Sequence, residues 1–352
     1  MQKKLFRVIS MVLGFSLLAG CAARASAVQP EQPYVDEVNI AEEILMDEAE
    51  VMAEVPAAAL PADFNNPIQT AQAVQQPQQQ PEQSAVTVIV PEASGILVKK
   101  TDKAIIDYSN TADGYVMVKF TAAGDKRLKA RVEGPKTTYT YDIKKGEWTV
   151  FPLSDGNGAY QIKVFENVSG TRYMVVASAG CNVTLKDEFA PFIRPNQYVD
   201  YGCAEKTLSK AQELTKGMTD PLKKVEAVYT YVVKNLTYDY NKAATVKSGY
   251  LPVLDTVLEA KKGICFDYAA LMTGMLRSQG IPCKLVVGYA GTAYHAWISV
   301  WTEATGWIDG VVYFDGASWH RMDPTFASSG GQSKSIMAYI GNGSNYTEKY
   351  LY

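Results

Sequence analysis

The chemical signal in this sequence is a cysteine, a histidine and an aspartate that follow one another in that order. Cys265 begins a helical pattern, His295 lies in a strand pattern, and Asp323 ends the next strand pattern. A thiol nucleophile, an imidazole base and a carboxylate that orients the imidazole form the cysteine version of the catalytic triad. Because the chain has only two histidines, His295 has one rival as base, His320, whose place near a strand end favours a surface role.

The sequence around Cys265 favours an activated thiol. The apolar pattern predicts a helix from Cys265 to about Ser278, and a helix N-terminus offers unpaired N–H groups and a partial positive charge that favour the thiolate. Gly263 allows the backbone to come close and leaves room for a substrate. The backbone N–H of Cys265 is one candidate oxyanion donor, and Tyr238 is a candidate for the second. A buried helical cysteine is also a common core residue, so only the set as a whole indicates catalysis.

The strand that carries His295 also carries an aromatic residue two positions on. Side chains alternate between the faces of a strand, so His295 and Trp297 share a face, and the Trp297 indole would shield a thiolate–imidazolium pair from water. We expect Asp323, on an adjacent strand, to accept the other imidazole N–H. His295 would then protonate the leaving amine and activate the second nucleophile.

The elements that must position these residues fall in two regions. Short alternating segments separated by Gly, Asn and Asp turns predict a β-sandwich of immunoglobulin-like size over residues 86–190, as a partner-binding domain, a spacer or a lid. Helices followed by antiparallel strands predict an α+β domain over residues 198–352. The predicted strands of the first region are 87–90, 104–108, 115–120, 128–132, 149–153, 159–165, 173–177 and 182–185. In the second region we predict helices from Pro221, over 253–260 and over 265–278, and strands at 284–289, 293–301, 311–314 and 319–322.

The N-terminal 85 residues predict an anchor and a linker. A short basic segment and the apolar run Val8 to Leu18 end at Cys21, which resembles the lipobox of a bacterial lipoprotein signal over residues 1–21. Lipidated Cys21 would hold the protein at the cell membrane, facing outside the cytoplasm; an ordinary secretory signal is the alternative. Residues 22–85 are first acidic, with nine Asp and Glu between 31 and 54, and then rich in Gln and Pro, which predicts a disordered linker.

Composition excludes several classes of function. The formal net charge of −3 gives no nucleic-acid footprint. Two histidines and no Cys-x-x-Cys pair are too few ligands for a usual zinc site, so we expect neither a metal nor another cofactor. Cys181, Cys203 and Cys283 allow at most one disulfide, and a Cys181–Cys203 pair is one possibility. The oligomeric state does not follow from the sequence.

Several short segments between residues 207 and 325 together resemble the transglutaminase-like superfamily, whose core is related to papain-type thiol enzymes. The resemblance implies that Cys265 is the nucleophile, His295 the base and Asp323 the residue that orients it. It also fits a secreted or lipid-anchored bacterial protein with a β domain before the core. The long calcium-binding insertions of animal transglutaminases are not evident, so calcium is not implied. The matching segments are 231–238, 263–271, 280–283, 288–289, 295–297 and 322–325.

This resemblance implies an acyl-thioester at Cys265. Water as the second nucleophile would make the protein a cysteine peptidase or amidase that acts on proteins or cell-wall peptides, which is the activity we expect. A lysine amine would make it a cross-linking transglutaminase. A non-catalytic surface binding module is the third possibility, but a pure binding domain has no use for an intact Cys-His-Asp set.

Overall fold

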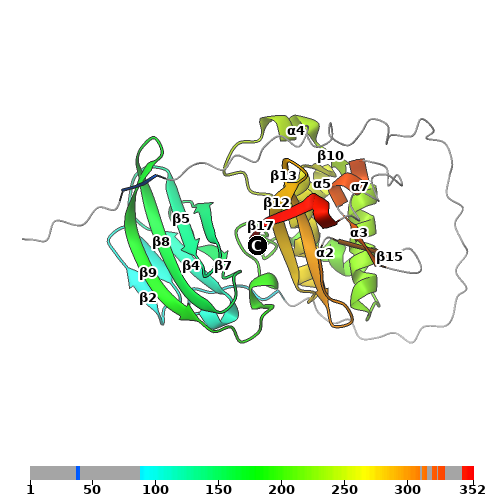
Figure 1. Cartoon of the computed structure of the whole chain (residues 1–352), viewed down its shortest axis with the longest axis horizontal. Helices are drawn as coiled ribbons and strands as arrows, with labels where there is room; N and C mark the ends of the chain where they lie inside the picture. Colours follow the sequence, from blue (N-terminus) through cyan, green and yellow to red (C-terminus); the bar gives the residue numbers. More distant parts are fainter. Residues whose placement is uncertain (1–36, 40–87, 310, 315–318, 323, 330–342) are drawn as a thin grey trace, which may run out of the picture. The chain divides into compact units, whose positions relative to one another are not determined.

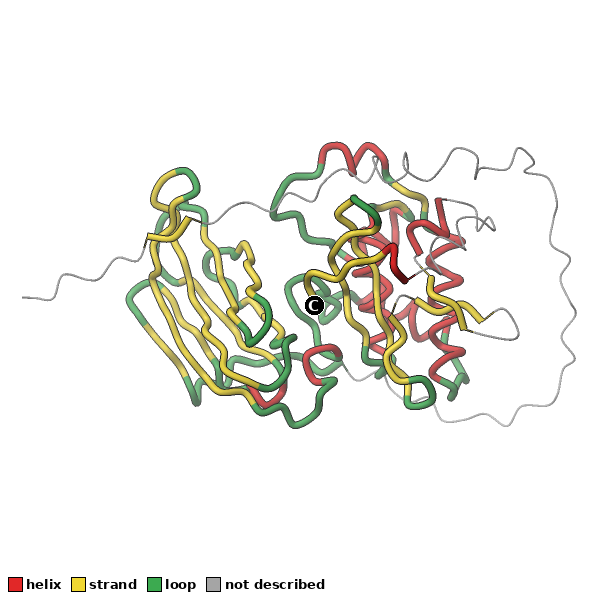
Figure 2. The backbone as a smooth tube through the Cα atoms, in the orientation of Figure 1, coloured by secondary structure: helices red, strands yellow, loops and turns green. Residues whose placement is uncertain are grey.

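A computed structural model describes residues 37–39, 88–309, 311–314, 319–322, 324–329 and 343–352. The predictions for Cys21, Asp323, the signal segment and nearly all of the linker therefore lie outside the described residues. The structure is a mixed α and β structure in which, among the described residues, strands β1 to β9 come first and every α-helix follows them in the chain (Figure 1 and Figure 2). None of the helices in these described ranges is long and apolar enough to cross a membrane.

The first region consists of two antiparallel sheets. One sheet has the strand order β2-β3-β4-β7, and the other has the order β1-β9-β8-β5-β6. The four-stranded sheet contains β2 (Val98–Lys100), β3 (Ala104–Asp107), β4 (Tyr115–Phe120) and β7 (Thr149–Pro152). The five-stranded sheet contains β1 (Glu37–Asn39), β5 (Leu128–Glu133), β6 (Thr138–Asp142), β8 (Gly158–Ser169) and β9 (Arg172–Val183).

Three of the predicted strands in this region differ from the structure. The segments 173–177 and 182–185 are parts of one strand, β9, because β8 pairs with it along its length and a register shift after Val164 keeps the ladder continuous. Residues 88–90 form no strand, and Ile89 and Val90 are exposed. Strand β6, whose alternating buried side chains are Tyr139 and Tyr141 rather than aliphatic residues, was not predicted from the sequence, and neither was β2. The prediction of a disordered linker over residues 22–85 is wrong at β1, because residues 37–39 pair with β9.

The second region combines helices with an antiparallel sheet of order β14-β13-β12-β17. Its helices are α2 (Glu205–Leu214), α3 (Pro221–Asn235), α4 (Tyr240–Thr245), α5 (Leu254–Ala260), α6 (Cys265–Ser278) and α7 (Pro324–Ser329). The sheet contains β12 (Cys283–Ala290), β13 (Ala293–Thr302), β14 (Gly306–Asp309) and β17 (Tyr346–Leu351). Two pairs complete the region: β10 (Thr237–Tyr238) lies parallel to β11 (Lys262–Gly263), and β15 (Val311–Phe314) lies antiparallel to β16 (Trp319–Met322).

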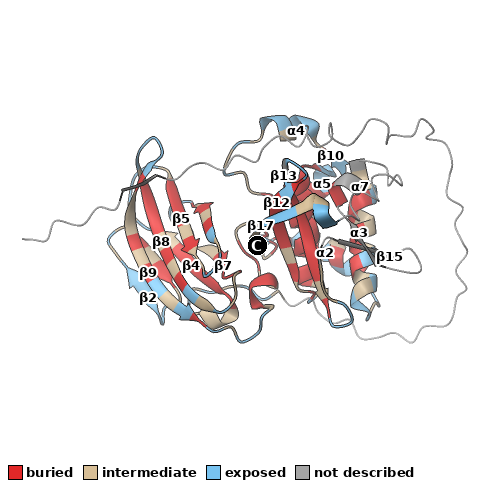
Figure 3. Ribbon diagram, viewed as in Figure 1, coloured by how far each residue is buried: buried red, intermediate tan, exposed pale blue. Residues whose placement is uncertain are grey.

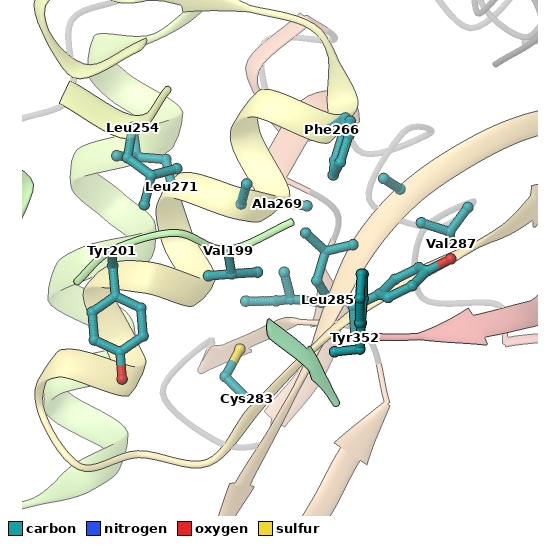
Figure 4. Close-up of a cluster of buried hydrophobic side chains, with 14 of the residues drawn as sticks. Val199, Tyr201, Leu254, Phe266, Ala269, Leu271, Cys283, Leu285, Val287 and Tyr352 are labelled. Carbon is teal, nitrogen blue, oxygen red and sulfur yellow. The ribbon is translucent and has the colours of Figure 1, made fainter. Parts of the chain in front are cut away.

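Helix α6 is the centre of this region. All of its residues are buried, since it packs against α2, α3 and α5 as well as against β12 and β13. Most of its side chains are apolar, and a helix with apolar residues all round needs such complete cover. Phe266 and Leu271 of α6 belong to the same buried cluster as Leu285 and Val287 of β12, and Leu271 lies beside Leu254 of α5 (Figure 4). The helix that begins with Cys265 is therefore held from several sides.

Most residues of β12 and β13 are buried, whereas those of α4 are exposed or half-buried (Figure 3). No residue of α4 is buried, and its first turn is capped by Asp239, whose carboxylate accepts a hydrogen bond from the Lys242 backbone N–H at 3.0 Å. Residues 36–352 cluster as one unit, and the boundary expected between 190 and 198 stays a prediction.

Candidate active site

Cys265 is the first residue of α6, and its side chain is buried, with 3% exposure. The residue before the helix, Ile264, donates its backbone N–H to the carboxylate of Asp267 at 2.9 Å. A carboxylate in the first turn complements the positive end of the helix and fixes the entry of the chain. The thiol therefore sits at a helix N-terminus whose backbone is tied from within the same turn.

Gly263 is required by this tight turn. A Cβ atom at Gly263 would lie 2.5 Å from the Cβ atom of Asp267, closer than carbon atoms approach. Gly263 also pairs with Tyr238 between β11 and β10, and its carbonyl accepts the Asp239 N–H at 2.9 Å. The backbone of Tyr238 is thereby held beside the residue two positions before the thiol.

Tyr238 has a buried hydroxyl without a hydrogen-bond partner among the described residues. The side chain is 8% exposed, and its ring meets the ring of Tyr240 edge-on at 4.9 Å. A buried hydroxyl usually finds a partner, because leaving it unpaired costs free energy. An unpaired donor beside the turn that leads to Cys265 is a candidate for a ligand-binding group.

His295 is the third residue of β13, lies opposite Gly288 of β12, and is 1% exposed. Helix α6 packs against β13, so the elements that carry the thiol and the imidazole are neighbours. The His295 and Trp297 rings lie on the same face of the strand, with centroids 6.1 Å apart and planes at 24°. Trp297 is itself 1% exposed and meets Tyr346 of β17 edge-on at 5.2 Å.

The glycine opposite His295 is also required by close packing. A Cβ atom at Gly288 would lie 2.0 Å from the Thr347 carbonyl oxygen and 2.9 Å from the ring of Trp297. The approach of β17 and the indole therefore leaves room only for a hydrogen at this position. This packing fixes the strand on which the histidine is carried.

Asp323 lies outside the described residues, and so does the side chain of His320. The helix α7, which sequence analysis missed, begins at Pro324 and is anchored through Ser328. The Ser328 hydroxyl donates to the carbonyl of Leu236 at 2.7 Å and lies 3.2 Å from the Tyr268 hydroxyl. The segment after Asp323 is thus tied both to α6 and to the end of α3.

The comparisons with known proteins match this region. Residues 209–324 match the family model described as the transglutaminase-like superfamily. They form a transglutaminase-like core. The protein-glutamine gamma-glutamyltransferase of Pseudomonas aeruginosa is 28% identical over 113 residues, which are 26% of this chain and 17% of that protein. YebA of Bacillus subtilis is 28% identical over 123 residues, which are 30% of this chain and 17% of that protein.

The chain therefore spans less than a fifth of the length of these two relatives. Among solved structures, a cysteine protease candidate from Cytophaga hutchinsonii is 13% identical, with a TM-score of 0.35, and the match covers 73% of this chain and 74% of that one. The periplasmic domain of TgpA from Pseudomonas aeruginosa is 17% identical, with a TM-score of 0.28, and the match covers 62% and 75%.

Three polar residues of the transglutaminase-like core were not recognised as part of the site from sequence. Asp267 is fully buried and accepts hydrogen bonds from the Lys242 ammonium at 2.6 Å and from the Tyr250 hydroxyl. Burial raises the pKa of the Tyr250 hydroxyl well above its usual value, and the nearby negative charge of Asp267 adds to this shift. Tyr250 therefore keeps its proton and remains a hydrogen-bond donor. The sequence signal was an aspartate in the first helical turn, but its partners lie 17 and 25 residues earlier in the chain.

The other described cysteines form neither a disulfide nor a metal site. All four described cysteines are free, so the disulfide that the sequence left open between Cys181 and Cys203 is not formed. Cys283 of β12 is fully buried, and this burial raises the pKa of its thiol to about 12. Among the described residues, no group of three or more His, Cys, Asp and Glu side chains could hold a metal ion.

Proposed function

We propose that this chain is a thiol enzyme that forms an acyl-thioester at Cys265 and then hydrolyses it. The observation that carries the proposal is a buried cysteine at the first position of α6, packed against the strand of the buried His295 within a transglutaminase-like core. A helix N-terminus favours a thiolate. A neighbouring imidazole can accept the thiol proton and later return it.

The proposed reaction has two halves. The Cys265 sulfur attacks the carbonyl carbon of an amide, and the amine leaves with a proton from His295. Water then attacks the thioester while His295 takes its proton, so that the acid is released and the thiol restored. The backbone N–H of Cys265 and the unpaired hydroxyl of Tyr238 are the proposed donors to the oxyanion. Asp323 is the proposed acceptor for the second imidazole N–H, and Trp297 the proposed shield against water.

The substrate class is proposed from the family resemblance and the location from the N-terminal sequence. Proteins or cell-wall peptides outside the cytoplasm are the proposed substrates, and lipidation of Cys21 is the proposed anchor. Residues 22–85 would give the enzyme reach from the membrane. The two sheets of residues 88–183 are proposed to form an immunoglobulin-like sandwich that serves as a spacer, a lid or a partner-binding domain.

Amine transfer is the second candidate function. The Pseudomonas aeruginosa relative is named a protein-glutamine gamma-glutamyltransferase, and the acyl-enzyme at Cys265 would be the same. Only the second nucleophile would differ, a lysine amine in place of water. The match covers 17% of that relative, so its activity enters here as a proposal.

A mass-spectrometric assay separates these functions. The protein is incubated with glutamine-containing peptides and a primary amine, and the peptide masses are compared for the wild type, Cys265→Ala and His295→Ala. Cys283→Ala is the matched control, since it removes a buried cysteine outside the site. We expect cleavage or deamidation that is lost in the two site variants and kept in Cys283→Ala. Incorporation of the amine would assign a transglutaminase, and no Cys265-dependent change would support a binding module.

A further inference from the structure

Asp267, Lys242 and Tyr250 form a closed polar network at the first turn of α6, which begins with Cys265. The Asp267 carboxylate, which is fully buried, accepts the Ile264 backbone N–H at 2.9 Å and the Lys242 ammonium at 2.6 Å. It also accepts the Tyr250 hydroxyl. The Lys242 ammonium in turn donates to the Tyr250 oxygen and lies 4.2 Å from the centre of its ring. Each member therefore contacts the other two.

The carboxylate has two opposing effects on the thiol. By holding the backbone of Ile264, it fixes the turn that delivers Cys265 to the start of α6. Asp267 is also the second residue after Cys265 in the same helical turn, and a negative charge near a thiol disfavours the thiolate. Lys242 supplies the opposite charge within ion-pair distance of the carboxylate. This ion pair would offset the effect of the carboxylate on the thiol while the hydrogen bond that orders the turn is kept.

Lys242 reaches this position from helix α4, which has no buried residue. Its own side chain is 27% exposed. The helix begins directly after Tyr238 and Asp239, which are held beside Gly263. The ion pair with Asp267 is therefore also a tether between the segment of the proposed oxyanion donor and the first turn of α6.

We propose that Lys242, Asp267 and Tyr250 form a positioning network for Cys265, in which Lys242 cancels the charge of the carboxylate that orders the turn. This inference rests on the proposed function of Cys265 as a nucleophile. Lys242 is a positioning residue, because it acts on the thiol through Asp267 and does not contact the reacting atoms.

Other ionisable groups on the elements packed around the start of α6 are occupied elsewhere or belong to the proposed site. Lys262 of β11 pairs with Asp239 at 3.1 Å. Asp255 of α5 accepts hydrogen bonds from Thr207 of α2. Helix α7 has no ionisable side chain, and α3 carries the exposed or half-buried Lys223, Lys224, Glu226, Tyr231 and Lys234 and the buried Tyr229. Lys206 of α2 pairs with Glu259 of α5, Lys210 of α2 pairs with Glu213, and Arg277 of α6 donates to backbone carbonyls. The other groups are Glu205 of α2, Cys283, Lys284 and Tyr289 of β12, His295 and Tyr294 of β13, Tyr238 of β10 and Tyr268 of α6.

The test is the pH dependence of alkylation, resolved by residue. The protein is treated with iodoacetamide between about pH 5 and 10, and peptides that contain Cys265 or the exposed Cys203 are quantified by mass spectrometry. In Lys242→Met the uncompensated carboxylate should lower the alkylation rate of Cys265 about tenfold near neutral pH, which equals a shift of its pH profile by about one unit toward higher pH. The profile of Cys203 should not move. Lys242→Arg should retain the wild-type profile of Cys265.

A charge-neutral double variant distinguishes electrostatics from packing. Lys242→Met combined with Asp267→Asn removes both charges, and the asparagine oxygen can still accept the Ile264 N–H. We expect this variant to recover most of the alkylation rate lost in Lys242→Met, and it also guards against a single variant that fails to fold. Tyr250→Phe keeps both charges and should shift the profile of Cys265 by less than Lys242→Met does.

Two results would overturn the inference. One is a Cys265 profile that does not change in Lys242→Met, and the other is a double variant as slow as Lys242→Met. The proposed function fails separately, if the pH profile of alkylation of wild-type Cys265 lies no lower in pH than that of Cys203, a comparison that does not depend on how far each thiol is exposed. In that case the thiol is not activated, whatever the network does.

Discussion

Replacing Tyr238 by phenylalanine should separate catalysis from stability. The change removes one oxygen from a side chain that is 8% exposed and whose hydroxyl has no hydrogen-bond partner among the described residues. The ring, its contact with Tyr240 and the backbone pairing with Gly263 stay in place. The variant therefore tests the hydroxyl alone.

The two expected effects have opposite signs. An unpaired buried hydroxyl costs about 1–3 kcal/mol, so its removal should leave the free energy of unfolding unchanged or raise it by about 1 kcal/mol. Loss of one oxyanion donor costs about 10²–10³ in kcat, or about 3–4 kcal/mol of transition-state stabilisation. A side chain with a purely structural role would lower stability and activity together.

A second tyrosine provides the matched control. Tyr141 of β6 is 1% exposed and also has no hydroxyl partner among the described residues, and its ring packs on Phe151 and Tyr198. Urea unfolding and turnover of an acyl substrate would be measured for Tyr238→Phe and Tyr141→Phe. Both variants should be as stable as the wild type or more stable, and only Tyr238→Phe should lose activity. Full activity in Tyr238→Phe would refute its assignment as an oxyanion donor.

Three further predictions concern the frame of the core. Arg277→Met should lower the free energy of unfolding by about 3–5 kcal/mol in urea, because the buried guanidinium donates to three backbone carbonyls at 2.7–2.9 Å; a loss below about 1 kcal/mol would contradict this. Burial raises the pKa of the Cys283 thiol from 9.0 to about 12. Its contribution to the free energy of unfolding is therefore complete below pH 9 and should fall by about 1.4 kcal/mol per pH unit up to pH 12. Cys283→Ala should lack that part of the pH dependence of unfolding, and identical slopes would disprove it. Gly288→Ala should lower the free energy of unfolding by about 1–3 kcal/mol and reduce turnover, since its Cβ would lie 2.0 Å from the Thr347 oxygen. An unchanged free energy of unfolding would show that β17 can shift to make room for the methyl group.

The helix and strand that carry Cys265 and His295 could be predicted because their signals are local. An apolar run between Gly263 and Gly280 predicts α6, and the alternation of His295 with Trp297 predicts their shared face on β13. The family resemblance was confirmed by the match to residues 209–324. The roles assigned to the individual site residues stay predictions.

The parts that could not be predicted depend on contacts between distant segments. Lys242 meets Asp267 across 25 residues, and no local pattern relates an exposed helix to a buried carboxylate. Helix α4 has no buried face, so it lacks the periodicity by which helices are found. Strand β17 has no buried residue, and it is a strand because β12 supplies its hydrogen bonds.

The late arrival of β17 has a consequence for folding. Strand β12 pairs with β13 next to it in sequence, but its other edge is covered only by residues 346–351, more than 50 positions further on. Until those residues have been synthesised, the apolar segment Leu285 to Val287 has an open edge, and such edges promote pairing between chains. A chain interrupted before Tyr346 would leave this edge open permanently. We therefore expect aggregation during synthesis to depend on how quickly these few residues reach β12.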